Sequence, residues 1–341
     1  MTTPVAVHLD TDIGGDTDDL CALALLLASP EVELVGITTC ADAEGYRRSF
    51  AEHALKLAGK TGLPVATGAR GFLGGLEHFP NAQDDRYWPG LDRLRPSRPG
   101  EALDLLEANA KAGATIVAIG PYTNLGIMES LRPGIFDAAP VIVMGGHLGM
   151  PEPGYPQWPT KWDYNVQSDR VAARIVFEKL NPTIVSLNVT LKTSLRRRDI
   201  SALQAGGKLS QLLAIQAELH WADNRVERLT SENPSLPTDM LNFQYDSAAC
   251  GAAFQMQGLT FGLERRVLDS DGENLHLRLS DDGPERQMVT DIDGEQPRMV
   301  MAFSREYTEK TEAGVILRLL KSLLSGLASE YGVRRGDVAS R

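Results

Sequence analysis

The sequence has 341 residues, 43% of them hydrophobic and 23% charged, which is the composition of a globular protein with a sizeable core. A net charge of −11 would repel a phosphate backbone, and the one compact basic run spans only residues 196–198, so we expect no nucleic-acid partner. Neither a basic leader nor an apolar run of about eighteen residues occurs, which argues against a secretion signal and a membrane span. The cysteines at positions 21, 40 and 250 are too sparse for a disulfide framework, so we expect a cytoplasmic protein.

Short β-branched runs alternate with longer amphipathic segments through the first half of the chain. Strands are predicted at residues 5–9, 34–38, 64–67, 115–119 and 141–144, and helices at residues 20–28, 46–58, 101–112 and 125–130. This alternation is typical of parallel βαβ units. It predicts an α/β fold with a doubly wound, mostly parallel sheet flanked by helices.

The second half of the chain continues this order and then changes. A helix at 170–179, a strand at 183–187 and helices at 209–221 and 246–256 are predicted. Residues 265–300 alternate polar and apolar side chains between Asp-Gly turns, which indicates a small antiparallel C-terminal appendage before a closing helix at 311–327. We expect one domain over residues 1–330, a flexible tail at 331–341, and a lid or binding loop within residues 71–99.

Five aspartates follow the first predicted strand: Asp10, Asp12, Asp16, Asp18 and Asp19. In an open parallel sheet, ligands bind at the carboxyl ends of the strands, which is where this cluster falls. Carboxylates this close raise one another's pKa, and a bound cation is the simplest way to relieve their repulsion. Oxygen ligands without nearby His or Cys select a hard ion, and Ca²⁺ tolerates an irregular loop better than Mg²⁺ does. The cluster therefore predicts a calcium site.

Other interpretations of the cluster fit less well. Aspartates often cap helices or line solvated loops, but five in ten positions exceed what capping needs. An EF-hand is disfavoured because Cys21 stands at the twelfth loop position, which requires a bidentate Glu. A magnesium-dependent phosphatase with an Asp-x-Asp-x-Thr/Val motif would match Asp10 and Asp12 but not Gly14, and it stays as an alternative function.

Residues 9–20 read Leu-Asp-Thr-Asp-Ile-Gly-Gly-Asp-Thr-Asp-Asp-Leu. This stretch resembles the signature of the nucleoside hydrolases, Asp-x-Asp-Pro-Gly followed by Asp-Asp, with Ile13 in place of the proline and two extra residues before the pair. Further blocks follow in the family's order: Gly-Pro-Tyr-Thr-Asn-Leu at 120–125, Val-Met-Gly-Gly at 143–146, Asp-Tyr-Asn at 163–165 and Tyr-Asp at 245–246. The resemblance, to inosine/uridine-preferring and calcium-dependent N-ribohydrolases, thus spans nearly the whole chain.

The resemblance implies a role for each matching residue. The implied metal ligands are Asp12, Asp19, Asp246 and the carbonyl of Thr123, with Asp10 beside them as a further ligand or support. The implied sugar contacts are Asp18, Asp163 and Asn165. Asp12 would also act as the general base, and the enzyme would release free base and ribose. A small-molecule nucleoside substrate and a homodimer or homotetramer are implied as well.

The chemistry explains why such residues are needed. Hydrolysis of an N-glycosidic bond passes through a sugar with oxocarbenium character, so the site must supply an activated water and a fixed diol. A calcium ion can chelate vicinal hydroxyls and orient a water whose proton Asp12 takes during attack on the anomeric carbon. Direct attack by water predicts inversion at that carbon.

Two positions depart from the family pattern and leave the substrate open. Tyr245 stands where many relatives have a His that helps the base to leave, and a phenol with a pKa of about 10 is the weaker acid. Asp42 stands near the place of an Asn that contacts the sugar. Other candidates to contact the substrate are His147 and Trp162, followed by Trp158, Tyr164, Tyr87, Trp88 and His78. A modified nucleoside or another ribosyl compound is therefore an alternative substrate.

Overall fold

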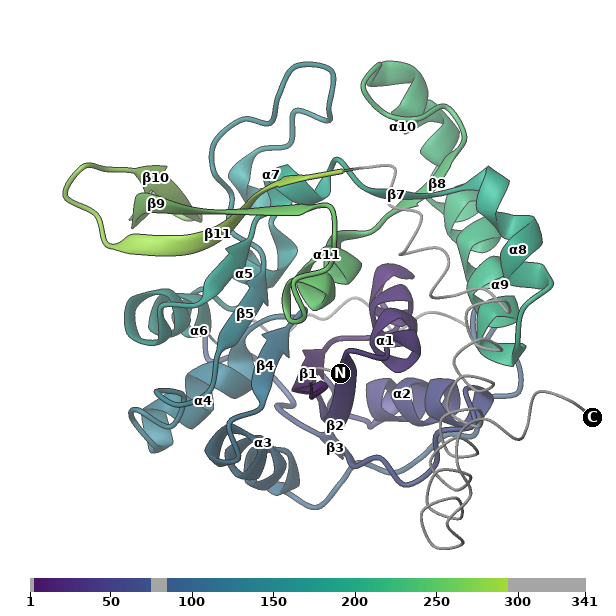
Figure 1. The fold of residues 1–341 in the computed structure, drawn as a ribbon, viewed down its shortest axis with the longest axis horizontal. Helices are drawn as coiled ribbons and strands as arrows, with labels where there is room; N and C mark the ends of the chain where they lie inside the picture. The colour runs from purple at the N-terminus through teal and green to yellow at the C-terminus, as the bar shows by residue number, and fades with distance from the viewer. Residues whose placement is uncertain (1–2, 75–84, 294–341) are drawn as a thin grey trace, which may run out of the picture.

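A nine-stranded sheet forms the centre of the computed structural model, whose described residues are 3–74 and 85–293 (Figure 1). Its strands are β1 (Val5–Thr11), β2 (Val32–Thr39), β3 (Val65–Thr67), β4 (Thr115–Ala118), β5 (Val141–Met144), β6 (Thr183–Val185), β9 (Leu259–Ser270), β10 (Leu275–Leu279) and β11 (Glu285–Ile292). Their order is β10-β9-β11-β6-β5-β4-β1-β2-β3. Neighbours from β11 to β3 are parallel, whereas β9 is antiparallel to β11 and β10.

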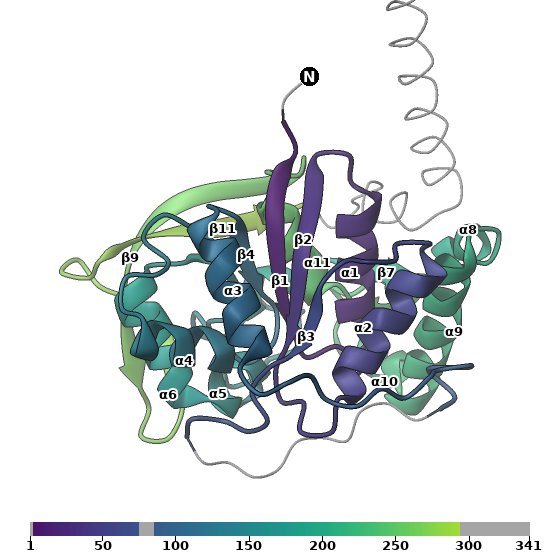
Figure 2. The same ribbon diagram turned by 90° about the horizontal axis from the view of Figure 1, so that it is seen from below.

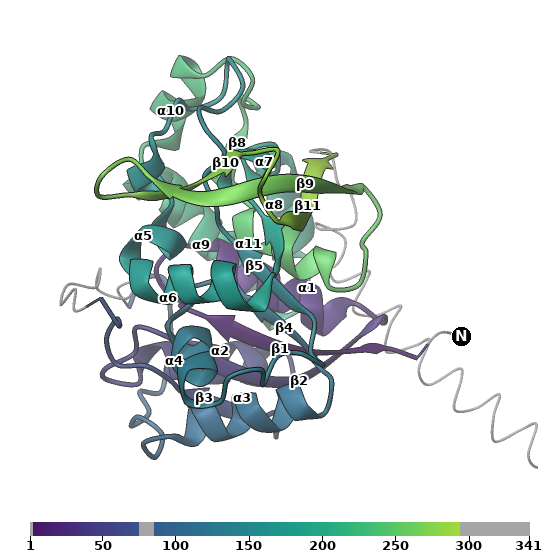
Figure 3. The ribbon, with the colours of Figure 1, turned by 90° about the vertical axis from the view of Figure 1, so that its left-hand side faces the viewer.

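Helices cover both faces of this sheet. In Figure 2, α3 (Glu101–Lys111), α4 (Thr123–Leu131) and α6 (Arg170–Ile175) lie on one side, and α1 (Asp18–Ala28), α2 (Tyr46–Leu57) and α9 (Lys208–Asp223) lie on the other. Figure 3 looks onto the side that carries α4 and α6. α11 (Tyr245–Ala252) packs against α1 and β5. The fold is the predicted doubly wound α/β architecture.

Smaller elements complete the described chain. A separate two-stranded sheet pairs β7 (Ser194–Arg196) with β8 (Met240–Phe243). The short helices are α5 (Tyr164–Ser168), α7 (Leu187–Thr190), α8 (Ile200–Gln204) and α10 (Val226–Glu232). No helix among the described residues is long and apolar enough to cross a membrane.

The core explains why α1 holds its place at the centre. α1 is apolar on nearly all sides, and Leu20, Leu23, Leu25 and Leu26 are fully buried between the sheet, α9 and α11. A helix that is hydrophobic all round must be enclosed by other elements. Enclosure fixes the first turn of α1, and with it Asp18 and Asp19, against the sheet.

The strand order reverses at β1, which lies between β2 and β4. At such a switch point the neighbouring connections leave toward opposite faces, so a crevice opens beyond the carboxyl ends of the strands. Asp10 pairs with Thr38 of β2 and with Ala118 of β4, and the chain from Asp12 onward enters the crevice.

Several boundaries differ from the sequence-based prediction. β1 extends to Thr11 because it is hydrogen-bonded on both sides, which places Asp10 inside the sheet. The predicted helix at 170–179 ends as α6 at Ile175 and continues as a π turn over Val176–Leu180. The antiparallel appendage extends the main sheet, because β11 pairs with β6. The closing helix at 311–327 and the tail at 331–341 lie outside the described residues.

Candidate active site

A cavity of about 610 Å³ opens at the crevice beyond β1. Its wall combines acidic residues, one arginine, one histidine, amides and aromatic rings. The acidic residues are Asp12, Asp16, Asp18, Asp19, Asp163 and Asp246. The other polar and aromatic residues are Arg47, His220, Asn165, Asn224, Asn242, Trp158, Trp162, Tyr164, Phe243 and Tyr245. Most of the residues predicted for the site therefore share one cavity.

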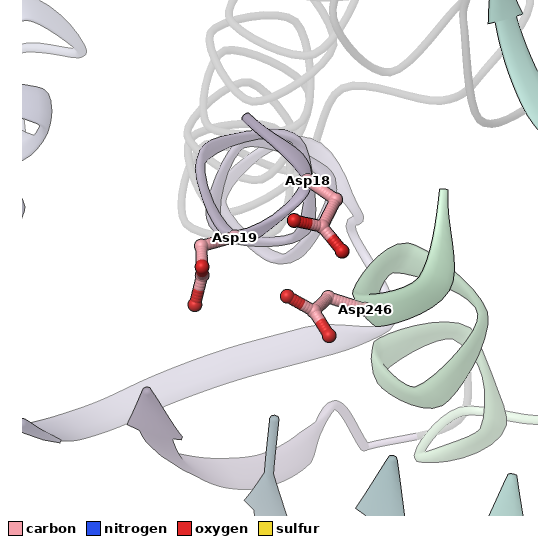
Figure 4. A group of neighbouring side chains, drawn as sticks. All are labelled: Asp18, Asp19 and Asp246. Atoms are coloured by element: carbon pink, nitrogen blue, oxygen red, sulfur yellow. The ribbon is translucent and has the colours of Figure 1, made fainter. Parts of the chain in front are cut away.

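Three buried carboxylates meet where two helices begin. Asp18 and Asp19 start α1, and Asp246 lies in the first turn of α11, so all three face the same space (Figure 4). Each offers an oxygen, and these oxygens lie within 4.8 Å of one another. Burial and the negative charges of neighbouring aspartates raise the pKa of all three well above the usual range. A divalent cation would remove that repulsion, and an all-oxygen donor set suits a hard ion.

Asp12 lies beside this triad and next to a buried arginine. Its Oδ2 is 3.9 Å from Nη1 of Arg47, a residue of α2. Arg47 is held by donating from Nε to the carbonyl of Ala41 and from Nη1 to that of Ile13. Burial raises the pKa of Asp12, whereas the positive charge of Arg47 lowers it. The arginine therefore favours the ionised form that a general base requires.

Asp10 lies beneath the cavity in a buried network of hydrogen bonds. Its Oδ2 accepts from Thr38 Oγ1 at 2.5 Å and from Asn124 Nδ2 at 2.6 Å, while Oδ1 is buried without a hydrogen-bond partner. His8 Nε2 is 2.9 Å from the same Thr38 hydroxyl, and burial lowers the pKa of His8 to about 3, so this imidazole is neutral. Burial also raises the pKa of Asp10 to about 7. An unpartnered buried oxygen here is consistent with a cation nearby.

Asp163 and Asn165 form a second polar group at the ends of β4 and β5. Asp163 Oδ2 accepts from the backbone N–H of Gly146 at 2.7 Å, and burial raises the pKa of Asp163 to about 7. Asn165 Nδ2 donates to the carbonyls of Ile119 and Met144 at 2.8 and 3.1 Å. With the amide nitrogen committed, the Asn165 oxygen is left to accept from a ligand hydroxyl.

Aromatic rings form the opposite part of the wall. Trp162 stacks on Trp158 with ring centroids 5.8 Å apart, Trp158 meets the edge of Phe243 at 5.7 Å, and Phe243 lies 5.1 Å from Tyr245. We call these four residues the aromatic row. Trp162 remains 57% exposed, so its ring is free to contact a ligand. Burial and nearby aspartates raise the pKa of Tyr245 well above its usual range, which favours a hydrogen-bonding role over proton transfer.

Other predicted site residues lie away from the cavity lining. Asp42 accepts from the backbone N–H groups of Arg47 and Arg48 at the start of α2. The ring of His147 contacts the carbonyl of Trp158 at 2.9 Å and is buried. Thr123, at the start of α4, is buried and donates from Oγ1 to Asp169. Asp42 and His147 thus hydrogen-bond to nearby backbone groups, and we assign neither of them a role in the reaction. The carbonyl of Thr123 remains a predicted metal ligand.

Two loop aromatics serve the core instead. Trp88 stacks on Phe50 at 4.4 Å, and Tyr87 donates to Asp223 at 2.9 Å. His78 lies outside the described residues. Conversely, sequence reasoning missed Arg47 and His220, because a single basic residue within a helix carries no motif. Only the packing of α2 and α9 brings them to the cavity.

Comparison with known proteins agrees with this geometry. The family model described as inosine-uridine preferring nucleoside hydrolase matches residues 7–302. The pyrimidine-specific ribonucleoside hydrolase RihA of Salmonella paratyphi A is 30% identical over 226 residues, which are 63% of this chain and 70% of the relative. A plant nucleoside hydrolase structure (PpNRh1) has a TM-score of 0.70 at 22% identity, covering 89% of this chain and 99% of its own. A purine-preferring ribonucleoside hydrolase from Gardnerella vaginalis has a TM-score of 0.69 at 20% identity, covering 89% of this chain and 98% of its own.

The fold and the curated relatives define this protein as a hydrolase that acts on N-glycosyl compounds. More particularly, the chain belongs to the inosine-uridine preferring nucleoside hydrolase family. This family is metal-dependent, and the buried triad of Asp18, Asp19 and Asp246 could hold a metal ion.

Proposed function

We propose that this protein hydrolyses the N-glycosidic bond of a ribonucleoside in a calcium-dependent reaction with Asp12 as the general base. The observation that carries the proposal is the buried triad of Asp18, Asp19 and Asp246, which shares a cavity with Asp12 and with the aromatic row. Family membership supports the reaction class.

The metal would be held by carboxylates of the two helix starts. Asp19 and Asp246 are the proposed ligands, with Asp12, Asp10 and the Thr123 carbonyl as further candidates. Asp18 stands equally close, so it either joins the ligands or binds a sugar hydroxyl from the same position. When bound, Ca²⁺ would supply positive charge that lowers the pKa of a water and anchors vicinal hydroxyls.

In this proposal Asp12 takes the proton of the attacking water. Its carboxylate lines the cavity, and the positive charge of Arg47 opposes the rise in its pKa that burial causes. Asp163 and the amide oxygen of Asn165 would hold the far hydroxyls of the sugar, which orients the anomeric carbon. Attack by water without a covalent intermediate inverts that carbon.

The nucleobase would stack on the aromatic row, with Trp162 as its exposed face. Stacking accepts any planar base, so the row alone does not select purine over pyrimidine. The names of the relatives include both kinds of base, since RihA is called pyrimidine-specific and the Gardnerella vaginalis enzyme is called purine-preferring. A modified nucleoside or another ribosyl compound remains the alternative substrate.

The test is a panel of purine, pyrimidine and modified nucleosides incubated with Ca²⁺ and assayed for free base and reducing sugar. Release of both from at least one nucleoside is the expected result. A parallel assay with phosphomonoesters and Mg²⁺ measures inorganic phosphate. Phosphate release without any reducing sugar would instead establish the Asp-x-Asp phosphatase activity.

We further propose that residues 1–330 act as one catalytic domain that assembles as a homodimer or homotetramer. The continuous sheet from β3 to β10 supports the single domain for the described residues. Light scattering coupled to size-exclusion chromatography, compared with the chain mass of 37.1 kDa, measures the assembly. A monomeric mass would contradict it.

A further inference from the structure

His220 is a cavity residue that the mechanism above does not use. It lies on α9, its side chain is only 12% exposed, and it lines the same cavity as Asp12. Its Nδ1 is 3.2 Å from Oδ1 of Asp16, in the loop between β1 and α1. Asp16 is itself fixed, because the same oxygen accepts from the backbone N–H of Thr17 at 2.5 Å.

The partners of the ring decide which nitrogen can act. Nδ1 of His220 faces the carboxylate of Asp16 at 3.2 Å, and this contact is an ion pair when the ring carries a proton on both nitrogens. The amide nitrogen of Asn224 lies 3.1 Å from Nδ1 and 3.2 Å from the carbonyl of His220, to which it donates. No residue of the ranges 3–74 and 85–293 hydrogen-bonds Nε2, which leaves this atom to serve a ligand.

The surroundings place His220 at the leaving-group end of the cavity. α9 packs against β8, the strand that carries Phe243 of the aromatic row. Trp221, next to His220 in the chain, packs in one apolar cluster with Phe243, Trp158 and Tyr245. A base stacked on the aromatic row would therefore lie next to His220.

We propose that His220, oriented by Asp16, is the acid that protonates the departing nucleobase; this inference rests on the proposed function. The C1′–N bond breaks, its electron pair goes to the base, and the Nε2 proton of His220 passes to the base. The water oxygen bonds to C1′ while its proton goes to Asp12. Return of one proton from Asp12 to His220 through solvent restores the enzyme, so nucleoside and water become neutral base and ribose.

The experiment compares two leaving groups on the calcium-loaded enzyme. A nucleobase needs a proton to leave, whereas p-nitrophenolate leaves p-nitrophenyl β-D-ribofuranoside as a stable anion. The variant His220→Asn keeps a donor toward Asp16 but has no acid, and we expect its nucleoside kcat to fall by about 10²–10⁴-fold. Its rate on the nitrophenyl riboside should stay close to that of the wild type. His220→Gln is the second variant if His220→Asn does not fold.

Asp16 is a positioning residue in this scheme. Asp16→Asn should therefore lower the rate on nucleosides while sparing the rate on the nitrophenyl riboside, and the loss should be smaller than in His220→Asn. His53→Gln is the matched control, because that imidazole packs 6.3 Å from the ring of Trp88 and does not line the cavity. It should change neither rate. Circular dichroism and melting temperature confirm that each variant folds.

Equal losses on both substrates in His220→Asn would overturn the inference, because they would show a role in the sugar step or in folding. Unchanged nucleoside hydrolysis in His220→Asn would also overturn it. If Tyr245→Phe then lost its rate on nucleosides but kept its rate on the nitrophenyl riboside, the acid would be Tyr245. A wild-type enzyme that cleaves only the nitrophenyl riboside would overturn the assignment of any leaving-group acid. A wild type inactive on both substrates would overturn the proposed function and this inference with it.

Discussion

The guanidinium of Arg47 lies 3.9 Å from the carboxylate of Asp12, and the two side chains are only 3% and 11% exposed. In this low-dielectric surrounding the positive charge opposes the desolvation of the carboxylate, which would otherwise favour its neutral form. The contact joins the start of α2 to the loop after β1. In the proposed mechanism it therefore widens, toward lower pH, the range in which Asp12 is ionised and can accept a proton.

Removal of the Arg47 charge should move the activity profile toward higher pH. In Arg47→Met the pKa of Asp12 rises, because the group that lowers it is gone, and a base must be ionised to act. We expect the acid limb of kcat/KM against pH to shift upward, with the largest loss at the acidic end. The matched control is Arg48→Met, whose side chain pairs with Glu52 at 3.7 Å on the helix surface. A profile that is unchanged or shifted to lower pH would contradict the role of Arg47.

Substitution of the proposed general base should abolish turnover without unfolding the protein. Asp12→Asn keeps the shape of the side chain but cannot accept the proton, so kcat should fall by about 10²-fold or more. Single-turnover assays of base release measure the loss, and circular dichroism verifies the fold. Residual activity above a few per cent of the wild type would assign the base elsewhere.

Calcium should stabilise the protein more at higher pH. The folded-state pKa values of Asp18, Asp19 and Asp246 are raised above 3.8, so the metal-free folded state binds more protons than the unfolded state. The stability that these extra protons contribute is fully present below the unfolded-state pKa, and it is lost as pH rises through the raised folded-state pKa values. In EDTA the melting temperature should therefore fall between about pH 5 and pH 8.

Added Ca²⁺ binds the ionised carboxylates, so its stabilising effect should be larger at pH 8 than at pH 5. Differential scanning fluorimetry with a calcium titration provides the measurement. Asp246→Asn removes one charge of the triad and should diminish the calcium-induced rise. An equal rise in that variant would exclude Asp246 as a ligand.

Truncation of the exposed tryptophan should weaken binding of the base. Trp162 is stacked on Trp158 at 5.8 Å and lines the cavity. Stacking of a base on an aromatic side chain is worth about 1–3 kcal/mol, so kcat/KM of Trp162→Ala should fall about 5- to 150-fold. Trp162→Phe should recover most of the loss because it restores a flat ring. Comparable losses in both variants would point to a structural role.

The sequence by itself determined the architecture and the centre of the site. Alternating strands and helices specify a parallel sheet, and a parallel sheet gathers the residues that follow its strands at one edge. For that reason the order of elements along the chain is enough to predict that the aspartates after β1 lie at a ligand site, whereas the resemblance to the nucleoside hydrolases assigned Asp163 and Asn165 to the same site. Helix and strand ends were less accurate, because β1 gains its last residues from hydrogen bonds to both neighbouring strands.

Only the tertiary structure decided which other side chains reach the cavity. Arg47 arrives because α2 packs beside the loop after β1, while Asp42, close to it in sequence, is used to cap the same helix. His220 arrives on α9, which belongs to no strand end of the main sheet. A local pattern cannot encode such contacts, because they depend on how whole helices pack against a shared core.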